Sequence, residues 1–318
     1  MNTTVLRMVA GRIASGLGSL LAVSVVVFAI TAVLPGDAAQ EKLGQEATPE
    51  AVAALRKEMG LDRSAVTRYF DWLGGIVTGD PGKSVATGMP VSEAIASRLP
   101  NSLLLAAATA AFAVPLALGL GILCALWRGS TFDRVTSMST VAVVCVPEFL
   151  VATLAVLVFA VHLKWLPALS SAPDLSSPGE MLRSFALPVL ALGSVIMAQM
   201  LRMTRAAVID QLAAAYIEMV RLKGATAART VLFHALPNAV GPIANAVALS
   251  LSYLLGGVII IEVIFNYPGI AKLMVDAVAQ RDMPLVQACT MIFCAAYLIL
   301  VLLADVCGIV ANPRLRHQ

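Results

Sequence analysis

The sequence predicts an all-α, polytopic membrane protein with six transmembrane helices. Its composition is the first reason: 59% of the 318 residues are apolar and only 13% are charged, whereas a soluble domain carries roughly a quarter charged residues. The second reason is that six separate apolar runs approach the roughly 20 residues needed to cross a bilayer as a helix. The third is that basic residues gather in alternate connections between these runs. A soluble enzyme and a disordered chain are both excluded.

The apolar runs define the expected spans in chain order. They cover residues 13–34, 102–127, 138–162, 185–201, 241–264 and 286–310. The first run is longer than the roughly 7–15 apolar residues of a secretory signal, so we expect it to be a membrane anchor. Prolines inside or near these runs are compatible with the assignment, because membrane helices tolerate proline better than soluble ones.

Basic residues in the short connections predict that both termini are cytoplasmic. They precede the first span, join the second span to the third and the fourth to the fifth, and follow the sixth. Short cytoplasmic segments of membrane proteins carry an excess of Lys and Arg. The residues concerned are Arg7, Arg12, Arg128, Arg134, Arg202, Arg205, Arg221, Lys223, Arg229, Arg314 and Arg316.

Residues 35–101 are expected to form a small helical subdomain on the extracytoplasmic side. This segment holds seven Lys or Arg and nine Asp or Glu, and a connection of its length crosses the membrane largely regardless of charge. Thr48 followed by Pro49 predicts a helix start, with the threonine as the cap and the proline in the first turn. Aromatic and apolar side chains expected at the membrane interface are Tyr69, Phe70, Trp72 and Leu73.

No constellation for catalysis, nucleotide binding or metal binding is apparent in the sequence. Residues 82–84 read Gly-Lys-Ser, but a phosphate-binding loop needs a further glycine five positions earlier, where Val77 stands. The three histidines, His162, His234 and His317, are far apart. We therefore expect a chain that is not an enzyme, binds no cofactor or metal itself and has no nucleic-acid partner.

One carboxylate lies well inside an apolar run. Glu148 follows Pro147 in the third expected span, and an ionised carboxylate facing lipid there costs at least a few kcal/mol. One interpretation is that Glu148 lines a pathway and meets a cationic group. The other is that it accepts a hydrogen bond that braces the Pro147 kink or a contact with another subunit. The sequence leaves both interpretations open.

The connection between the fourth and fifth spans has a helix–glycine–helix pattern. Its first part carries an apolar stripe at helical spacing, formed by Val208, Leu212, Tyr216, Met219 and Val220. Glu218 and Arg221 stand three residues apart and therefore share one helix face. Gly224 is expected to end this helix, and Pro237 marks the start of the fifth span after a second short helix. A helix lying on the membrane surface has a similar pattern, but the glycine favours docking in a groove of another protein.

This connection resembles the EAA loop of permease subunits in ATP-binding-cassette (ABC) importers. The resemblance rests on a helix, on Gly224-Ala225 and on the ending Leu236-Pro237. Nearly the whole chain further resembles the first, or B-type, permease of the dipeptide, oligopeptide and nickel subfamily. The matching strings are Leu34-Pro-Gly-Asp37, Ala47-Thr-Pro-Glu50, Met59-Gly-Leu-Asp62, Arg68-Tyr69 with Trp72, Gly79-Asp80 to Ser84, Pro90-Val91, Arg98-Leu-Pro100, Gly256-Gly257, Glu262, Phe265, Pro268-Gly269 and Arg281-Asp282-Met283-Pro284. The chain departs from the subfamily at Ala38, where proline is usual, and at Ala271, where glycine is frequent.

The resemblance implies a multi-pass subunit of the bacterial inner membrane that forms half of a pathway for di- or oligopeptides. Its implied partners are a second, C-type permease, two ABC ATPases that would hold ATP and Mg, and an extracytoplasmic solute-binding protein. Residues 1–34 would be the N-terminus and first span, residues 35–101 the extracytoplasmic subdomain, and residues 102–318 the permease core with a coupling loop at about 202–240. The coupling residues implied are Tyr216, Glu218, Arg221, Gly224, Ala225, Leu236 and Pro237. Alternatives are an importer of the same type for nickel chelates, glutathione or other small solutes, and a self-sufficient carrier or channel.

Overall fold

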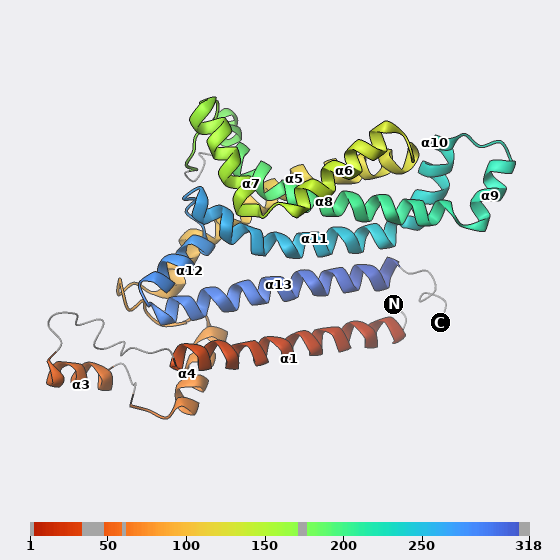
Figure 1. The fold of residues 1–318 in the computed structure, drawn as a ribbon. Coiled ribbons are helices and arrows are strands. Elements are labelled where there is room, and N and C mark those ends of the chain that lie inside the picture. The colour runs from red at the N-terminus through yellow and green to blue at the C-terminus, as the bar shows by residue number, and fades with distance from the viewer. Residues whose placement is uncertain (1–2, 34–47, 59–61, 171–176, 312–318) are drawn as a thin grey trace. The chain divides into compact units, whose positions relative to one another are not determined.

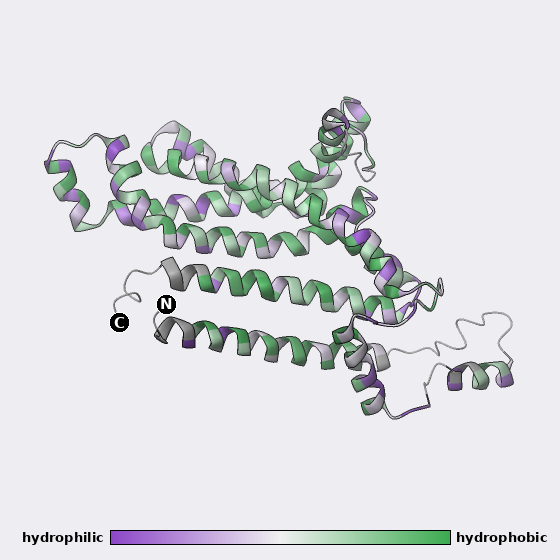
Figure 2. Cartoon of the chain, turned by 180° about the vertical axis from the view of Figure 1, so that it is seen from behind, coloured by the Kyte–Doolittle hydropathy of each residue, from purple (hydrophilic) through white to green (hydrophobic). Residues whose placement is uncertain are grey.

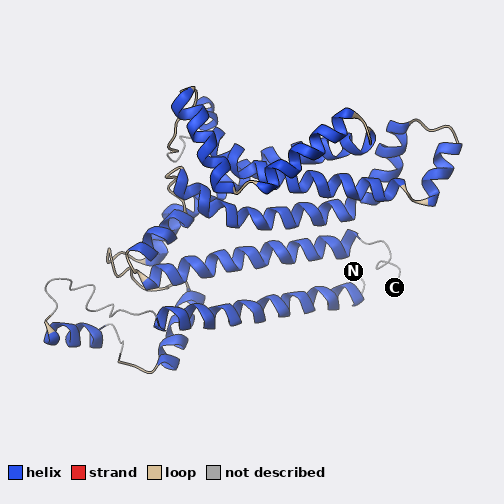
Figure 3. Ribbon diagram, in the orientation of Figure 1, coloured by secondary structure: helices blue, strands red, loops and turns tan. Residues whose placement is uncertain are grey.

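The computed structural model describes residues 3–33, 48–58, 62–170 and 177–311, and helices make up most of these ranges (Figures 1 and 3). Within them no β-strand occurs, and one isolated bridge pairs Lys83 with Pro90. The elements are α1 (Thr3–Val33), α3 (Pro49–Glu58), α4 (Ala65–Thr78), α5 (Val91–Leu126), α6 (Thr131–Cys145), α7 (Glu148–Ala155), the π-helical η2 (Val156–His162), α8 (Pro178–Leu212), α9 (Ala215–Leu222), α10 (Ala227–Arg229), the π-helical η3 (Thr230–Ala235), α11 (Leu236–Ile264), α12 (Ile270–Ala279) and α13 (Met283–Ala311). The all-α prediction is confirmed.

Five helices are long and apolar enough to cross a membrane, and Figure 2 shows them as predominantly hydrophobic. The candidate spans are Arg7–Thr31, Val91–Leu126, Gly179–Leu212, Ala227–Ile264 and Met283–Val306. The apolar run at 138–162, predicted as one span, is instead a pair of helices, α6 and α7–η2, bent by 102°. Pro147 causes this break, because it disfavours helical backbone at the preceding residue, and Val146 is extended with φ −92° and ψ 127°. If the bent pair is counted as one span, the number of candidates is six.

The chain divides into two compact units, and α8 is the central helix of the first. This unit consists of Met1–Ala14, Leu103–Tyr267 and Tyr297–Gln318. Within it α6 and α11 both pack against α8, alongside which they lie in Figure 1. Burial is highest in α8, where 56% of the apolar window is enclosed by other parts of the chain. One cluster of its core consists of Ala125, Val208, Val231, Ala239 and Ile243.

The second unit consists of Ser15–Ser102 and Pro268–Ala296. Its apolar core is formed by Val91, Ile95, Ile270, Ala277, Leu285, Ala288 and Cys289. Two hydrogen bonds join its two chain segments: the Asn101 side chain donates to the Pro268 carbonyl at 2.8 Å, and the Ile270 N–H donates to the Ser102 hydroxyl at 2.8 Å. Residues 101 and 102 of α5 are therefore fixed to the start of α12.

In the same unit, α4 packs against α1 through aromatic side chains. The Phe28 ring of α1 lies 5.5 Å from the ring of Tyr69 and 5.7 Å from that of Trp72. The Tyr69 hydroxyl also shares a 2.8 Å hydrogen bond with Ser24. The Phe70 ring lies 5.3 Å from that of Tyr69 but is 63% exposed, so of the predicted interfacial aromatic residues Tyr69 and Trp72 pack against α1 and Phe70 lies at the surface.

The predicted start of α3 is confirmed. This helix begins at Pro49, and the Thr48 hydroxyl accepts a hydrogen bond from the N–H of Ala51 at 3.2 Å. The threonine therefore satisfies one of the first-turn donors that a helix leaves unpaired.

Asp282, between α12 and α13, fixes the 84–86 turn within the second unit. Its side chain is buried and accepts hydrogen bonds from the Ser84 hydroxyl and from the N–H of Val85 at 3.1 Å. A longer bond, at 3.4 Å, comes from the N–H of Ala86. One carboxylate thus holds a turn that is almost 200 residues earlier in the chain.

We expect Asp282→Ala to release this turn. Loss of several bonds to one buried carboxylate costs about 2 kcal/mol, so amides of residues 82–90 are expected to exchange with deuterium at least about tenfold faster. Asp276→Ala is the matched control, because the Asp276 side chain is 48% exposed and forms its salt bridge within its own helix, with Lys272. Equal exchange of the 82–90 amides in both variants would show that Asp282 does not hold the turn.

Candidate functional site

The segment between α8 and α11 has the predicted helix–glycine–helix arrangement. After α9 the chain turns at Gly224, whose φ is +81° and whose added Cβ would meet nothing within 4 Å. Glycine is therefore required there for its left-handed backbone and not for space. The N–H of Ala225 closes the turn by donating to the Val220 carbonyl at 3.3 Å. Thr226 then caps α10, and α11 begins at Leu236.

The boundaries of this segment differ from the prediction. The sequence assigns residues 202–240 to the loop, but residues 202–212 belong to α8 and residues 236–240 to α11. The predicted apolar stripe is also not on one continuous helix, because Ala214 is extended, with φ −73° and ψ 145°, between α8 and α9. Val208 is consequently buried in α8, whereas Met219 is 57% exposed on α9.

Tyr216 ties α9 to the start of α11. Its hydroxyl lies 3.3 Å from both the His234 carbonyl and the Gln211 side-chain oxygen and donates to one of them at a time, while the Asn238 side chain donates to it at 3.1 Å. Asn238 also donates to the same carbonyl, at 2.9 Å. Next to this network, Leu236 packs against the first unit's core and Pro237 is exposed. The sequence predicts a role for Tyr216 but misses His234 and Asn238, because such bonds leave no periodic pattern.

The surface of α9 and η3 presents charged and large apolar side chains together. Glu218 and Arg221 are exposed, and in the described part of the chain they form no ion pair with each other. Leu222 is 77% and Phe233 is 72% exposed. Ile217 is buried and anchors α9 to the protein. Exposed apolar groups with a charged rim are typical of a surface that contacts another protein.

Glu148 is the first residue of α7, directly after the break in the bent span. Its carboxylate lies against Gly257 of α11: a Cβ added to this glycine would be 2.9 Å from Oε2 and 3.0 Å from Oε1 of Glu148. The same Cβ would be 2.6 Å from the Cδ1 methyl of Leu192 on α8. Glu148 is half-buried, and the described residues supply no hydrogen bond or ion pair to its carboxylate. Among the described residues there is thus no hydrogen bond with which Glu148 braces the Pro147 kink.

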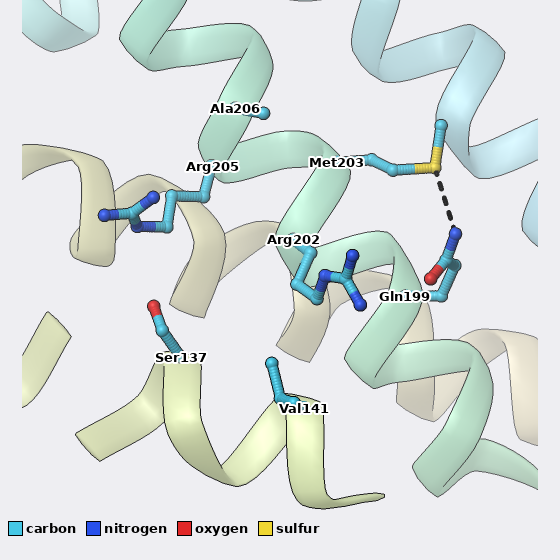
Figure 4. Close-up of a pocket in the computed structure, with 7 residues that line it drawn as sticks. All are labelled: Ser137, Val141, Gln199, Arg202, Met203, Arg205 and Ala206. Atoms are coloured by element: carbon cyan, nitrogen blue, oxygen red, sulfur yellow. Dashed lines mark hydrogen bonds between the residues drawn. The ribbon is translucent and has the colours of Figure 1, made fainter. Parts of the chain in front are cut away.

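A bidentate ion pair joins α6 to α8. Asp133 accepts hydrogen bonds from Arg205 at 2.6 Å and 2.8 Å and from the Gly129 N–H at 2.9 Å. Next to this pair is a cavity of about 340 Å³ between α6 and α8 (Figure 4). It is lined by Ser137, Val141, Gln199, Arg202, Met203, Arg205 and Ala206. Within the described ranges, no three His, Cys, Asp or Glu side chains come close enough together to hold a metal ion.

Comparison with known proteins identifies the kind of protein to which this geometry belongs. Residues 117–317 match the family described as binding-protein-dependent transport system inner membrane component, and residues 5–106 match the N-terminal part of such components. The chain belongs to this family. It is 34% identical over 300 residues to the glutathione transport system permease protein GsiC of Escherichia coli (strain K12) and to that of Salmonella typhi. Each match covers 94% of this chain and 95% of the relative.

The protein is therefore an inner-membrane permease subunit of a binding-protein-dependent ABC importer, a transport component and not an enzyme. This confirms the resemblance to permeases of the peptide and nickel subfamily. Importers of this family also contain ATPase subunits, a solute-binding protein and a paired permease.

The contact between Glu148 and Gly257 makes a specific prediction for the permease. Gly257→Ala is expected to lower the free energy of unfolding by about 1 kcal/mol, the lower end of the cost of overpacking, because the new methyl displaces only the ends of two side chains, those of Leu192 and Glu148. Gly256→Ala is the control, since a Cβ there meets nothing within 4 Å. Thermal unfolding of the purified protein in detergent measures both. A Gly257→Ala variant as stable as Gly256→Ala would contradict the close approach of α7, α8 and α11.

Proposed function

We propose that this permease forms half of a translocation pathway for short peptides, with glutathione as the first candidate solute. The observation that carries the proposal is the similarity over 94% of the chain to permeases named for glutathione transport. Glutathione is itself a tripeptide, so it falls within the solute class that the sequence resemblance implies. Nickel chelates remain the alternative cargo for an importer of this type.

The proposed topology has six spans with both termini in the cytoplasm, and the bent pair α6 and α7–η2 is its third span. The five apolar helices and the bent pair support this number. The basic residues of the short connections support the orientation. Residues 35–101 are then the extracytoplasmic subdomain, and residues 102–318 form the permease core.

The proposed partners are a C-type permease, two ABC ATPases and an extracytoplasmic solute-binding protein. ATP and Mg would be held by the ATPases, and this chain would bind neither. The exposed charges and apolar side chains of α9 and η3 support a docking surface for an ATPase. The coupling residues are those predicted: Tyr216, Glu218, Arg221, Gly224, Ala225, Leu236 and Pro237.

In this mechanism, closure of the ATPases would push on α9 and turn the pathway from outward-facing to inward-facing. Tyr216 supports such a transfer of movement, because it links α9 to the start of α11 through His234 and Asn238. The turn at Gly224 separates α9 from α10, so a push on α9 would reach α11 both through this turn and through the Tyr216 network.

Glu148 is proposed to line the pathway at the bend of the third span and to meet a cationic group of the solute, such as a peptide amino group. Its half-buried carboxylate without a hydrogen-bond partner in the described residues supports this role. Its position at the start of α7 is favourable for a carboxylate, because helix N-termini stabilise negative charge.

Uptake by the complete importer tests the proposed solute class. The importer is reconstituted in proteoliposomes with ATP inside and the solute-binding protein outside, and accumulation of radiolabelled glutathione, a dipeptide and a nickel chelate is compared. We expect ATP-dependent uptake of glutathione or the dipeptide, competed by the other peptide. Uptake of the nickel chelate alone would contradict the peptide proposal.

A further inference from the structure

The cavity between α6 and α8 contains a positive charge without a counterion. Arg202 lines this cavity from α8 as an exposed residue. It lies within the candidate span Gly179–Leu212, about 15 Å from the end of α8 at a rise of 1.5 Å per residue. In the part of the chain that the structure describes, its guanidinium makes no ion pair and no hydrogen bond. Charged residues inside membrane spans are rare and almost always face a water-filled cavity or a partner, because a lipid-facing charge is costly.

The neighbouring arginine shows what Arg202 lacks. Arg205 lies three residues later on α8 and lines the same cavity, but Asp133 neutralises it through two hydrogen bonds. In Figure 4 the Arg205 guanidinium points away from the centre of the group, whereas the Arg202 side chain extends toward Val141 of α6. The cavity therefore retains about one net positive charge, which comes from Arg202.

The remaining lining fits a small polar solute better than a lipid chain. Gln199 supplies an amide with two N–H donors, one of which lies 4.0 Å from the Met203 sulfur, whereas the Ser137 hydroxyl already donates to Asp133 at 3.5 Å. Met203 supplies a polarisable side chain that adapts to differently shaped ligands. A volume of about 340 Å³ lies within the roughly 300–1,000 Å³ of small-molecule sites. Guanidinium groups pair with carboxylates through charge-assisted hydrogen bonds, and every unmodified peptide carries at least one carboxylate.

We propose that this cavity is a carboxylate-binding site on the translocation pathway, in which Arg202 binds the solute and the Gln199 amide adds a neutral hydrogen bond. The inference rests on the proposed peptide import and deepens it, because it assigns selection for anionic groups to the permease as well as to the solute-binding protein. It also places solute contact on α8, the helix that leads directly into α9.

The test restores or reverses the charge at position 202 in the complete importer. Arg202→Cys is made in a version of this chain whose five native cysteines are replaced. The reference is the importer with the same cysteine-free chain in which Arg202 is retained. S-methylglutathione is the solute, since it lacks a free thiol. We expect Arg202→Cys to lower uptake about tenfold or more, as loss of a charged hydrogen bond does. Aminoethyl methanethiosulfonate, which adds a positive charge, is expected to restore at least half of the reference uptake, whereas the neutral methyl and the negative sulfonatoethyl reagents are not.

A second measurement separates a solute site from other anions. S-methylglutathione at saturating concentration is expected to slow labelling of the cysteine at position 202 at least about fivefold. The control is Arg134→Cys, which removes an exposed arginine of α6 outside the cavity and is expected to show neither charge rescue nor protection. Rescue of uptake by the positive reagent without protection of the cysteine from labelling would overturn the inference. The anion would then belong to a partner subunit, or to lipid if uptake varies with the phosphatidylglycerol content. If the reference importer shows no uptake, the proposed solute class is contradicted. If the reference uptake is normal but uptake by Arg202→Cys does not depend on the charge of the reagent, this site alone is contradicted.

Discussion

Replacing Gly224 by valine is expected to reduce ATP-driven uptake by about tenfold or more while the permease remains in the membrane. The cause is the backbone: φ is +81° at this position, a left-handed conformation that costs a residue with a Cβ about 1–2 kcal/mol. For a β-branched residue the cost is greater. The turn between α9 and α10 would therefore rearrange and misplace the surface proposed to contact an ATPase. Uptake and the amount of permease in purified membranes are measured on the same preparation.

Two comparisons make this prediction specific. Gly224→Asn is expected to keep most of the activity, because asparagine tolerates left-handed backbone better than other residues. Gly79→Val carries the same strain, since Gly79 has φ of +84° and open space around it, but it lies at the end of α4. Wild-type uptake by Gly224→Val, or equal losses in the Gly79 and Gly224 variants, would show that the α9–α10 turn has no special role in coupling.

Breaking the ion pair between α6 and α8 is expected to have the largest effect on stability, and the two partners are expected to differ. Arg205→Ala leaves the Asp133 carboxylate, whose side chain is only 3% exposed, without its counterion, and loss of one partner of a buried pair costs about 3–5 kcal/mol. Asp133→Ala leaves an arginine that is 28% exposed and can reach water, so its cost should be smaller. In thermal unfolding in detergent, we expect the unfolding temperature to fall from the wild type to Asp133→Ala and further to Arg205→Ala.

An exposed ion pair provides the reference for this prediction. Arg63 and Asp71 form a salt bridge whose side chains are 56% and 54% exposed, and such pairs contribute about 0–1 kcal/mol. Arg63→Ala should therefore unfold close to the wild-type temperature. If Arg205→Ala were as stable as Arg63→Ala, the pair would not stabilise the contact of α6 with α8.

Much of the fold can be predicted from the sequence because membrane spans depend on composition over long windows. The five long apolar helices coincide with predicted runs, and Thr48 and Pro49 mark a true helix start. The position of the bend could be predicted from Pro147, but its angle could not. Proline restricts the backbone conformation of the preceding residue without fixing the direction of the next helix. The break after Leu212 had no signal, because Ala213 to Ala215 are the strongest helix formers and only tertiary packing, such as burial of Ile217, separates α9 from α8.

The candidate site was predicted only in part, for a similar reason. Gly224 has a local requirement, a left-handed backbone, which a sequence pattern can reveal. The bonds of Tyr216 with His234 and Asn238 and the contact of Glu148 with Gly257 join residues more than 15 positions apart, for which one sequence gives no distance information. Arg202 and Arg205 look alike as basic residues that follow the apolar run 185–201, and only the position of Asp133 beside Arg205 distinguishes them.

The central claim is that this chain is an importer permease driven through α9 and η3 by separate ATPases. Purification of the chain with a photo-crosslinker in α9 tests this claim most directly. The chain is tagged at its C-terminus, benzoylphenylalanine replaces Leu222 or, as a control, the exposed Phe70 of α4, and the protein is isolated from native membranes in mild detergent after illumination. The account predicts a stoichiometric second permease and ATPases in both preparations, with an ATPase crosslinked from position 222 and none from position 70. A stable chain that is isolated alone, without an ATPase crosslink at position 222, would contradict it.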